Sequence, residues 1–373
     1  MKPRHIHTAV ALCMSVSMPA ALAAPAAAAV EPRHNSRPGL QKLLDRIVAG
    51  GSGRRDRRGP RREHHLAGEP QAGRGSTAPS RPGADGRFRA GSVTKSFTAT
   101  VVLQLVGEGK LELSDSVEQW LPGLVGQGGT ITVRNLLQHT SGIPEYATGL
   151  FDEDGVLKDR YRTWTARELV ERAEEHPHEF PAGTRFGYSN TNYIVLGMLI
   201  ERVTGRPYAS EIRERILRPL GLGHTLLPGT SPEVPGAHPH AYVRVVEGGE
   251  VVPVDVTRFN ATVAGAAGSI ISTTADLNRF YRALLGGELL GPALLKEMKD
   301  PGGAMEYGLG LEVASLPCGV AYGHGGGTNG YSTVAFSSPD GTRQLALSMT
   351  PYSDDRKRAA MALLTSALCP PQR

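Results

Sequence analysis

The sequence predicts an α+β fold in which an antiparallel sheet, flanked by terminal helices, is joined to a mostly helical lobe. Three observations support this prediction. Helical spacing of apolar residues dominates the middle of the chain, the period changes to that of strands near the C-terminus, and one more helical segment follows the strands. With 373 residues, 40% of them hydrophobic, the chain is long enough for a large core in one or two domains.

The expected helices can be placed in chain order. Residues 38–49 place their aliphatic side chains on one helical face. Residues 96–107 are strongly apolar, and two nearby glycines end that helix. The further segments expected here are a short one at 131–138, a buried helix at 190–203 and a helix from Thr273 to about Leu285.

Four segments near the C-terminus have the composition of strands. They are 307–313, 320–323, 331–337 and 343–350. The sequence Pro339-Asp340-Gly341 predicts a turn between two of them. Ser353 then caps a last helix at 354–368.

The N-terminus has the pattern of a secretory signal peptide. Lys2 and Arg4 precede an apolar core at 8–22, and an Ala-x-Ala cleavage site ends at Ala23. We expect residues 1–29, which include an Ala-rich cleavage region, to be removed and the protein to be secreted. No apolar stretch after residue 30 reaches the roughly 18 residues that a spanning helix needs, so we expect no stable membrane anchor.

The formal net charge of +5 is unevenly distributed along the chain. Residues 1–50 carry +4 and residues 51–87 carry +5, so residues 88–373 carry −4. A mildly acidic body argues against a basic binding face. We therefore expect no nucleic-acid partner, and we expect a monomer.

Residues 51–87 differ in composition from the rest of the chain. Leu66 is the one large apolar residue among nine Arg, eight Gly and four Pro. Such a stretch buries too little surface to offset the entropy lost on ordering, so we interpret it as disordered or loop. The globular pattern starts at Phe88.

The cysteines indicate one disulfide in an oxidising compartment. Cys13 leaves with the signal peptide, and Cys318 and Cys369 remain. The alternative is a pair of buried free thiols. A bridge closing a loop of this length adds roughly 4 kcal/mol in the chain-entropy model.

Three short motifs carry candidate chemistry. The first is Ser92-Val93-Thr94-Lys95, which places an amine one helical turn from a hydroxyl at the start of an apolar helix. A capping serine with a solvated lysine is the structural alternative. The second is Tyr188-Ser189-Asn190, where a phenol can relay a proton and an amide can orient a carbonyl. A plain turn with an N-cap explains it equally well in isolation.

The third motif is Gly323-His324-Gly325-Gly326-Gly327, at the end of a predicted strand. Consecutive glycines in a strand mark a place where another backbone or a ligand approaches closely. His324 can donate a proton or a hydrogen bond from that edge.

These motifs, in this order, resemble those of the penicillin-recognising serine hydrolases, the class C-like serine β-lactamases and secreted actinomycete D-alanyl-D-alanine carboxypeptidases. That family uses S-x-x-K, then Y-x-N, then K-T-G or H-x-G. The matching runs beyond the catalytic residues are Phe88–Phe97, Leu136–Gly142, Tyr188–Tyr193 and Tyr307–Gly310. The resemblance covers residues 88–369 almost continuously and implies a single β-lactamase-like domain at 38–369.

The resemblance implies a role for each motif residue. Ser92 is the acylated nucleophile, Lys95 assists as base with Tyr188 as its proton partner, and which of the two is the acylation base is left open. Asn190 positions the substrate, and His324 replaces the lysine of the third motif. The backbone N–H groups of Ser92 and Gly327 are expected to form the oxyanion hole.

Further implications concern the substrate site and the disulfide. We expect Gly326 and Phe151 to contact the substrate. Cys318 and Cys369 match the disulfide of the actinomycete carboxypeptidases.

The sequence departs from the carboxypeptidases at the positions that hold the substrate's terminal carboxylate. Two threonines and an arginine of that family are replaced by Gly325, Gly327 and Glu312. A glutamate repels a carboxylate instead of binding it. An esterase or amidase on the same fold is therefore a serious alternative.

We therefore expect an exported serine hydrolase that acts through an acyl-serine, of the D-alanyl-D-alanine carboxypeptidase or β-lactamase-related type. Its substrate is then a small peptide, β-lactam or ester, or a peptidoglycan stem peptide. A second alternative, from another class, is a non-catalytic binder of such stems. We expect no cofactor and no metal, because the pairs His176/His178 and His238/His240 lack further ligands in sequence.

The family's fold also implies two strands within residues 51–87, which would complete a five-stranded sheet with three C-terminal strands. No strand pattern exists there. Because Arg, Gly, Pro and Ala dominate when GC-rich codons are read out of frame, we hypothesise a local frameshift between about Gly51 and Asp85. A genuine disordered insertion is the alternative.

Overall fold

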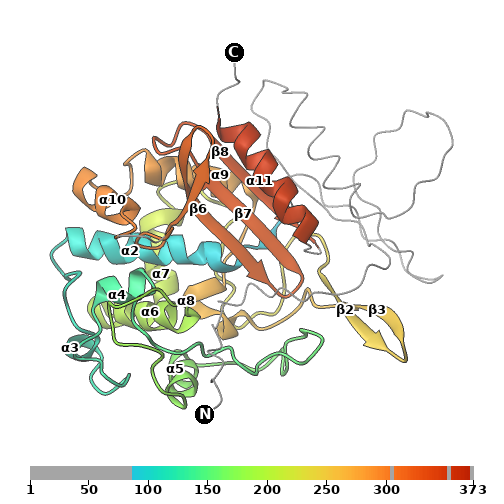
Figure 1. Cartoon of the computed structure of the whole chain (residues 1–373), viewed down its shortest axis with the longest axis horizontal. Helices are drawn as coiled ribbons and strands as arrows, with labels where there is room; N and C mark the ends of the chain where they lie inside the picture. Colours follow the sequence, from blue (N-terminus) through green and yellow to red (C-terminus); the bar gives the residue numbers. More distant parts are fainter. Residues whose placement is uncertain (1–85, 303–305, 351–353, 370–373) are drawn as a thin grey trace, which may run out of the picture.

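The computed structural model describes residues 86–302, 306–350 and 354–369 (Figure 1). The predicted signal peptide, the predicted helix at 38–49 and nearly all of residues 51–87 lie outside this part. The elements of the first half are β1 (Phe88–Arg89), η1 (Gly91–Val93), α2 (Thr94–Gly107), α3 (Val117–Trp120), α4 (Val133–Leu137), α5 (Ala166–Glu174), α6 (Asn190–Thr204), α7 (Tyr208–Ile212) and η2 (Arg213–Leu217). Those of the second half are β2 (Tyr242–Glu247), β3 (Glu250–Asp255), η3 (Ala261–Val263), α8 (Gly265–Gly268), β4 (Ile271–Ser272), α9 (Thr274–Leu285), α10 (Pro292–Lys299), β5 (Glu312–Leu316), β6 (Gly319–Thr328), β7 (Tyr331–Ser337), β8 (Gln344–Met349) and α11 (Asp354–Leu368).

The main sheet of the described part is antiparallel, with the strand order β5-β6-β7-β8. Helix α11 packs on one of its faces, while α2 and α9 lie on the other (Figure 1). The α+β prediction is thus confirmed. The sheet contains four strands from the C-terminal part, one more than the family frame implied.

Each face of the sheet has its own apolar cluster because side chains alternate along a strand. Phe336, Leu345 and Leu347 face α11, where they meet Leu363 and Leu364. On the opposite face, residues such as Ala335 and Ala346 join the large core of the helical lobe. This second face is the one that positions the candidate site.

Helices α2 and α6 form the centre of the helical lobe. Eleven of the 14 residues of α2 are buried. Phe97 on α2 stacks on Phe280 on α9, with the ring centroids 3.7 Å apart. The predicted helices at 96–107, 190–203, 273–285 and 354–368 are confirmed within a few residues by α2, α6, α9 and α11.

Two strand predictions need correction. The segment predicted at 307–313 is mostly a turn, in which Gly308 N–H donates to the Leu311 carbonyl at 2.8 Å, and β5 begins only at Glu312. The strand predicted to end at residue 323 continues to Thr328, because its glycines pair with β7 instead of breaking the strand. The segment at 131–138 contains the short helix α4.

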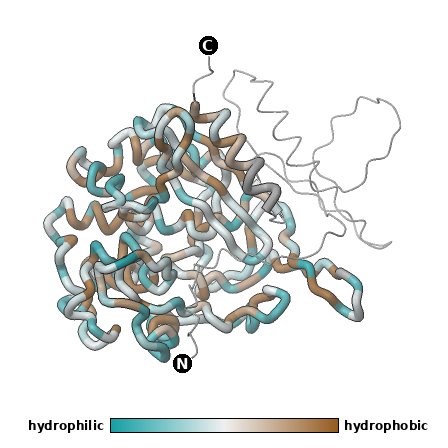
Figure 2. The backbone as a smooth tube through the Cα atoms, viewed as in Figure 1, coloured by the Kyte–Doolittle hydropathy of each residue, from teal (hydrophilic) through white to brown (hydrophobic). Residues whose placement is uncertain are grey.

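A hairpin of β2 and β3 was not predicted and extends from the body of the molecule (Figure 1). Valines recur along both of its strands, and the turn between them is hydrophilic (Figure 2). Its signal in the sequence was the Gly248-Gly249 pair between two runs rich in valine.

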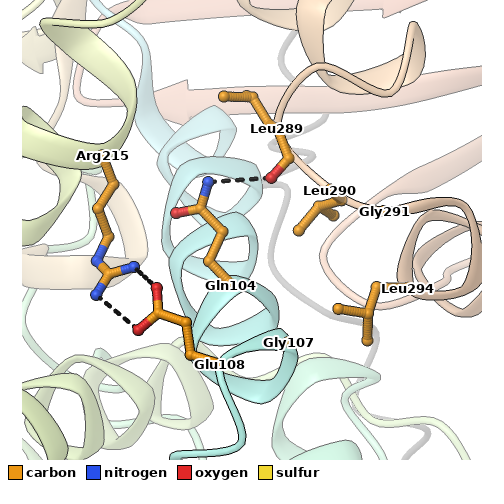
Figure 3. Close-up of a pocket in the computed structure, with 8 residues that line it drawn as sticks. All are labelled: Gln104, Gly107, Glu108, Arg215, Leu289, Leu290, Gly291 and Leu294. Atoms are coloured by element: carbon orange, nitrogen blue, oxygen red, sulfur yellow. Dashed lines mark hydrogen bonds and ion pairs between the residues drawn. The ribbon is translucent and has the colours of Figure 1, made fainter.

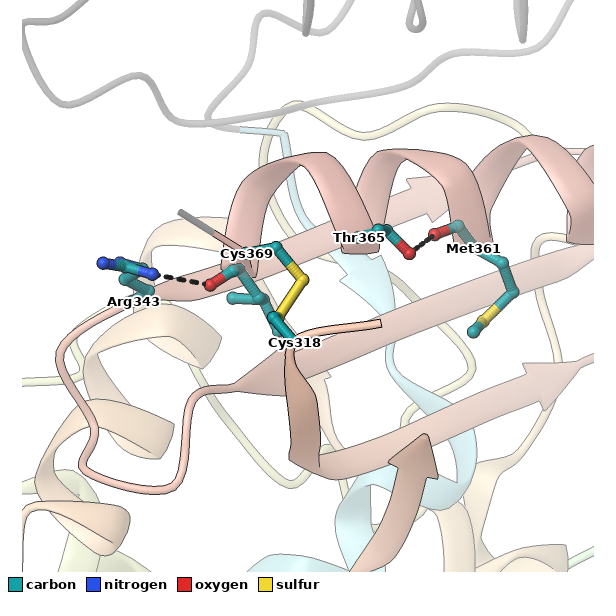
Figure 4. The surroundings of a disulfide bond; sticks show 6 residues. Cys318, Arg343, Met361, Thr365 and Cys369 are labelled. Atoms are coloured by element: carbon teal, nitrogen blue, oxygen red, sulfur yellow. Dashed lines mark hydrogen bonds between the residues drawn. A yellow bond between two sulfur atoms is a disulfide. The ribbon is translucent and has the colours of Figure 1, made fainter. Parts of the chain in front are cut away.

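A disulfide joins Cys318 and Cys369, as predicted (Figure 4). Cys318 lies in the turn between β5 and β6, and Cys369 follows α11. Arg343 donates a hydrogen bond of 2.9 Å to the Leu368 carbonyl and so caps the same end of that helix. The bridge therefore holds α11 against the sheet. Among the described residues, no helix has the length and apolar character needed to cross a bilayer.

Candidate active site

Ser92 and Lys95 meet at the junction of η1 and α2. Lys95 Nζ donates to Ser92 Oγ at 3.0 Å, to Asn190 Oδ1 at 2.7 Å and to the Ala267 carbonyl at 2.9 Å. The lysine side chain is fully buried, whereas Ser92 is partly exposed. Three acceptors fix the amine beside a hydroxyl that substrate can reach.

The segment that carries Ser92 is held by its neighbours. Thr94 Oγ1 donates to the Gly91 carbonyl at 2.7 Å and accepts from Ile270 N–H at 3.0 Å. Ala90 N–H donates to the Ile270 carbonyl at 2.8 Å. These bonds tie the start of α2 to the segment that leads into β4.

Strand β6 passes so close to Ser92 that only glycine fits. A Cβ added to Gly326 would lie 2.0 Å from the Ala90 carbonyl oxygen. A Cβ on Gly91, whose φ is +56°, would lie 2.7 Å from the Gly327 carbonyl oxygen. The expected close backbone approach is thus present, and the glycine run is explained by it.

The free edge of β6 carries two N–H groups that point away from β7. Gly325 N–H donates to Glu312 Oε2 at 3.1 Å. Residues two apart in a strand point the same way, so Gly327 N–H lies on the same edge. The approach of Gly327 to Gly91 places this group beside Ser92.

Tyr188 and Asn190 lie at the start of α6, on the other side of Lys95. Lys95 Nζ is 4.9 Å from the centroid of the Tyr188 ring, and Asn190 accepts its hydrogen bond directly. The Tyr188 ring stacks on His139, with centroids 4.2 Å apart. The predicted residues Ser92, Lys95, Tyr188 and Asn190 are therefore brought together.

Glu145 is a polar partner of the site that sequence reasoning missed. Its Oε2 accepts from Asn190 N–H at 2.8 Å and from Asn190 Nδ2 at 2.9 Å, and its Oε1 accepts from Ala147 N–H at 2.9 Å. Burial raises the pKa of this carboxyl, against which the hydrogen bonds and the charge of Lys95 act. A carboxylate directly after Pro144, in an otherwise apolar stretch, was the available signal.

His139 lies beneath the Tyr188 ring and holds the start of α6 through hydrogen bonds. Its Nδ1 accepts from Ser189 N–H at 3.2 Å and from Asn192 Nδ2 at 3.1 Å. Burial, followed by the charge of Lys95, holds its pKa well below the ordinary value. The ring is therefore neutral, and its stacking orients Tyr188.

His324 faces the helical lobe and bonds to Tyr307 instead of Ser92. Its Nε2 lies 2.9 Å from Tyr307 Oη, and its Nδ1 lies 3.2 Å from Glu312 Oε1 and also contacts the Gly325 carbonyl. Burial lowers the pKa of His324, against the opposing effect of Glu312. Its expected catalytic role stays a prediction.

Phe151 lies in a loop beside the other end of β6. It forms an antiparallel bridge with Leu157 and is partly buried. With its side-chain amide assigned in the orientation that satisfies both atoms, Asn329, in the turn after β6, donates to the Gly155 carbonyl at 2.8 Å and accepts from Leu157 N–H at 3.1 Å. The loop is thus attached next to the site, and the substrate contact of Phe151 stays a prediction.

Other candidate sites in the described part carry less chemistry. His178 pairs with Glu174 and His240 with Asp255, and no group of three metal-ligating side chains occurs there.

A surface cavity of about 320 Å³ lies at the far end of α2, where Glu108 pairs with Arg215 (Figure 3). Gln104 donates to the Leu289 carbonyl at its rim. This cavity is about four helical turns from Ser92 along the chain.

A serine at a helix start, a buried lysine on the next turn, a Tyr-Ser-Asn corner and a glycine-rich strand together suit the site of a serine hydrolase. Comparison with known families agrees: the beta-lactamase family model matches residues 47–368, and the chain belongs to this family.

Known relatives and solved structures refine the comparison. A D-stereospecific amidohydrolase from Streptomyces sp. has 40% sequence identity to this chain, and its structure superposes with a TM-score of 0.69. The match covers 77% of this chain and 88% of that one. A D-amino acid amidase from Ochrobactrum anthropi SV3 is 27% identical, with a TM-score of 0.63, over 75% and 83%. Penicillin-binding protein 4* of Bacillus subtilis is 31% identical over 66% of this chain. The chain spans 57% of that relative, so little more than half of its length.

Proposed function

We propose that this protein hydrolyses amides or esters of D-amino acids through an acyl-Ser92 intermediate. The observation that carries the proposal is the 3.0 Å contact between Lys95 Nζ and Ser92 Oγ, next to the edge of β6. The D-stereospecific hydrolases among the similar structures support the substrate class. Export of the protein, from its predicted signal peptide, belongs to the same proposal.

The acylation step uses the groups around Ser92. Lys95 in its uncharged form, or Tyr188 in its phenolate form, accepts the hydroxyl proton while Ser92 Oγ bonds to the substrate carbonyl carbon. The N–H groups of Ser92 and Gly327 stabilise the oxyanion, a contribution near 3 kcal/mol for each donor. The proton passes to the leaving nitrogen or oxygen as its bond to carbon breaks.

Deacylation reverses the roles of these groups. Water attacks the acyl carbon and gives one proton to the same base. The bond between the acyl carbon and Ser92 Oγ then breaks, the base returns the proton to Oγ, and the acid is released. Lys95 Nζ donates to Asn190 Oδ1 as well as to Ser92 Oγ. The amide hydrogen of Asn190 that does not bond to Glu145 can donate to a substrate carbonyl.

A D-alanyl-D-alanine carboxypeptidase is the second candidate, favoured by the penicillin-binding relatives. Against it stand Gly325, Gly327 and Glu312 at the positions where a substrate carboxylate would bind. The Glu312 carboxylate accepts a hydrogen bond from Gly325 N–H at the edge of β6 and would repel a substrate carboxylate there. An amide or ester without a terminal carboxylate therefore suits the site better.

Hydrolysis of D- and L-phenylalanine p-nitroanilide, with the purified protein and its Ser92→Ala variant, tests the proposal. We expect kcat/KM to favour the D-substrate by at least about tenfold and the variant to lose about 10³-fold or more. A diacyl-L-lysyl-D-alanyl-D-alanine peptide is the matched carboxypeptidase substrate. Release of D-alanine alone would favour the second candidate, and activity unaffected by Ser92→Ala would contradict both.

A further inference from the structure

We propose that Glu312 forms a leaving-group subsite that binds a positive charge, so that the preferred substrates are D-aminoacyl amides whose leaving amine carries a second, cationic amine. This inference rests on the proposed function and specifies its substrate class. It assigns a specificity-determining role to a residue that touches the leaving group, not the reacting bond.

Glu312 is the first residue of β5, and its carboxylate lies at the free edge of β6. Its carboxylate is fixed by Gly325 N–H at 3.1 Å and by His324 Nδ1 at 3.2 Å, and its side chain is 37% exposed. Gly325 and Gly327 are two residues apart on one edge, so their N–H groups lie about 6.6 Å apart. A short substituent on the leaving amine therefore spans from the oxyanion position beside Gly327 N–H to the Glu312 carboxylate.

The leaving group points toward this end of β6. It takes its proton from Tyr188 or Lys95, and Tyr188 lies on the His324 side of the site. A continuous series of rings shows this: Tyr188 to His139 at 4.2 Å, His139 to Tyr307 at 4.9 Å, and Tyr307 to His324 at 5.6 Å. The opposite end of β6, at Asn329, is joined to the 155–157 loop and is left for the acyl side.

The reach of a small amide fits this spacing. By standard bond lengths, the third atom beyond the carbonyl carbon on the leaving side lies about 4 Å away. A charge on that atom or the next falls within ion-pair range of a carboxylate fixed at Gly325. The absence of a side chain at Gly325 leaves room for it, since an added Cβ there already meets both Glu312 oxygens at 3.5 Å.

The charge of Glu312 is not neutralised by its protein partners. Those partners in the described part of the chain are His324, which burial keeps neutral, and a backbone N–H. An anionic leaving group is therefore repelled, a neutral one is tolerated and a cationic one is attracted.

Three amides of D-phenylalanine with leaving amines of similar size test the inference. They are the 2-aminoethyl amide, which is cationic, the 2-hydroxyethyl amide, which is neutral, and the dipeptide D-phenylalanyl-glycine, whose free carboxylate is anionic. We expect kcat/KM to fall in that order, by about tenfold at each step at low salt. Raising the ionic strength should narrow the differences.

In the variant Glu312→Gln, the ratios of kcat/KM between each charged amide and the neutral amide should fall to within about threefold. Glu312→Lys should reverse the order. Glu247→Gln, an exposed carboxylate on the β2–β3 hairpin, is the matched control and should keep the wild-type order. Because Glu312 is more than one third exposed, we expect both variants to fold, which thermal melting checks.

Two results separate the possible failures. If Glu312→Gln keeps the wild-type steps of about tenfold in kcat/KM between the three amides, or if wild type itself shows no such steps, the subsite is excluded while the proposed function stands. If wild type hydrolyses none of the three, including the neutral amide, the proposed function fails and this inference fails with it.

Discussion

The Glu145 carboxylate accepts two hydrogen bonds from one residue, Asn190: one from its backbone N–H at 2.8 Å and one from its side-chain amide at 2.9 Å. The same asparagine then accepts from Lys95 at 2.7 Å. Glu145 thereby fixes which way the Asn190 amide points. It acts through Asn190 and is a positioning residue.

Glu145→Gln should lower kcat/KM by about 10- to 100-fold. Either orientation of the new amide sets its NH₂ against Asn190 or against Ala147 N–H, which strands a donor at a cost of about 1–3 kcal/mol. Steady-state kinetics with a D-amino acid amide measures the loss. Glu153→Gln, an exposed neighbour, is the control and should behave as wild type.

The pH profile separates positioning from simple loss of stability. Burial raises the pKa of Glu145, so its protonation in mild acid should reduce wild-type activity at a pH above the ordinary glutamate value of 4.5. The Glu145→Gln variant should not show this loss of activity in mild acid. An acid limb that is the same in both proteins would contradict the role assigned to Glu145.

Gly326→Ala should abolish most of the activity, by about 100-fold or more, because the new Cβ would lie 2.0 Å from the Ala90 carbonyl and would push β6 away from Ser92. Gly327→Ala keeps its N–H group and meets nothing within 4 Å. It should stay within a few fold of wild type. Equal effects of the two substitutions on kcat/KM would show that this close approach does not matter.

The stability of the protein should depend on His139 and pH. Burial depresses the pKa of His139 in the folded state, while the unfolded chain takes up a proton near the ordinary value of 6.5. The unfolding free energy should therefore decrease as the pH falls below about 6.5. In His139→Phe the decrease should be smaller, because only His324, whose pKa is also lowered, still contributes from the site.

His139→Phe should also lose stability at neutral pH, since Ser189 N–H and Asn192 Nδ2 lose their shared acceptor, at about 1–3 kcal/mol for each stranded donor. Urea unfolding at several pH values measures both effects. The exposed His176→Phe is the control and should keep the wild-type slope. An unchanged slope in His139→Phe would contradict the account.

Replacing both Cys318 and Cys369 by serine should lower the unfolding free energy by up to about 4 kcal/mol, because the bridge closes a loop of 51 residues. Cys318 lies nine residues from Gly327, about 30 Å along the strand, so kcat/KM below the melting range should not change. Chemical unfolding measures the expected loss of unfolding free energy, and steady-state kinetics measures whether kcat/KM is unchanged. A large loss of kcat/KM would show that the bridge positions the site as well.

The sequence could predict much of the site because the motif residues act through their side chains at short spacings. Ser92 and Lys95 are one helical turn apart, and Tyr188 and Asn190 stand at a helix start, where their side chains have a defined direction. The apolar segments of α2 and α6 were equally clear, since most positions of both helices are buried.

The remaining features depend on tertiary contacts that no local pattern records. The Ala267 carbonyl holds Lys95 through its backbone, so its residue type carries no signal. Glu145 meets Asn190 only when two loops 45 residues apart are packed together. Strand β6 continues through glycines of low strand propensity because they pair with β7, and the close approach of the Ala90 backbone requires a glycine at position 326.

Trapping of the acyl-enzyme tests whether Ser92 forms a covalent bond to the substrate. The protein is quenched in acid during turnover of D-phenylalanine p-nitrophenyl ester, digested with trypsin and analysed by mass spectrometry. We expect one phenylalanyl adduct, on the peptide Ala90–Lys95, that is absent from the Ser92→Ala variant. Turnover that continues in Ser92→Ala with no adduct on this peptide would contradict this expectation.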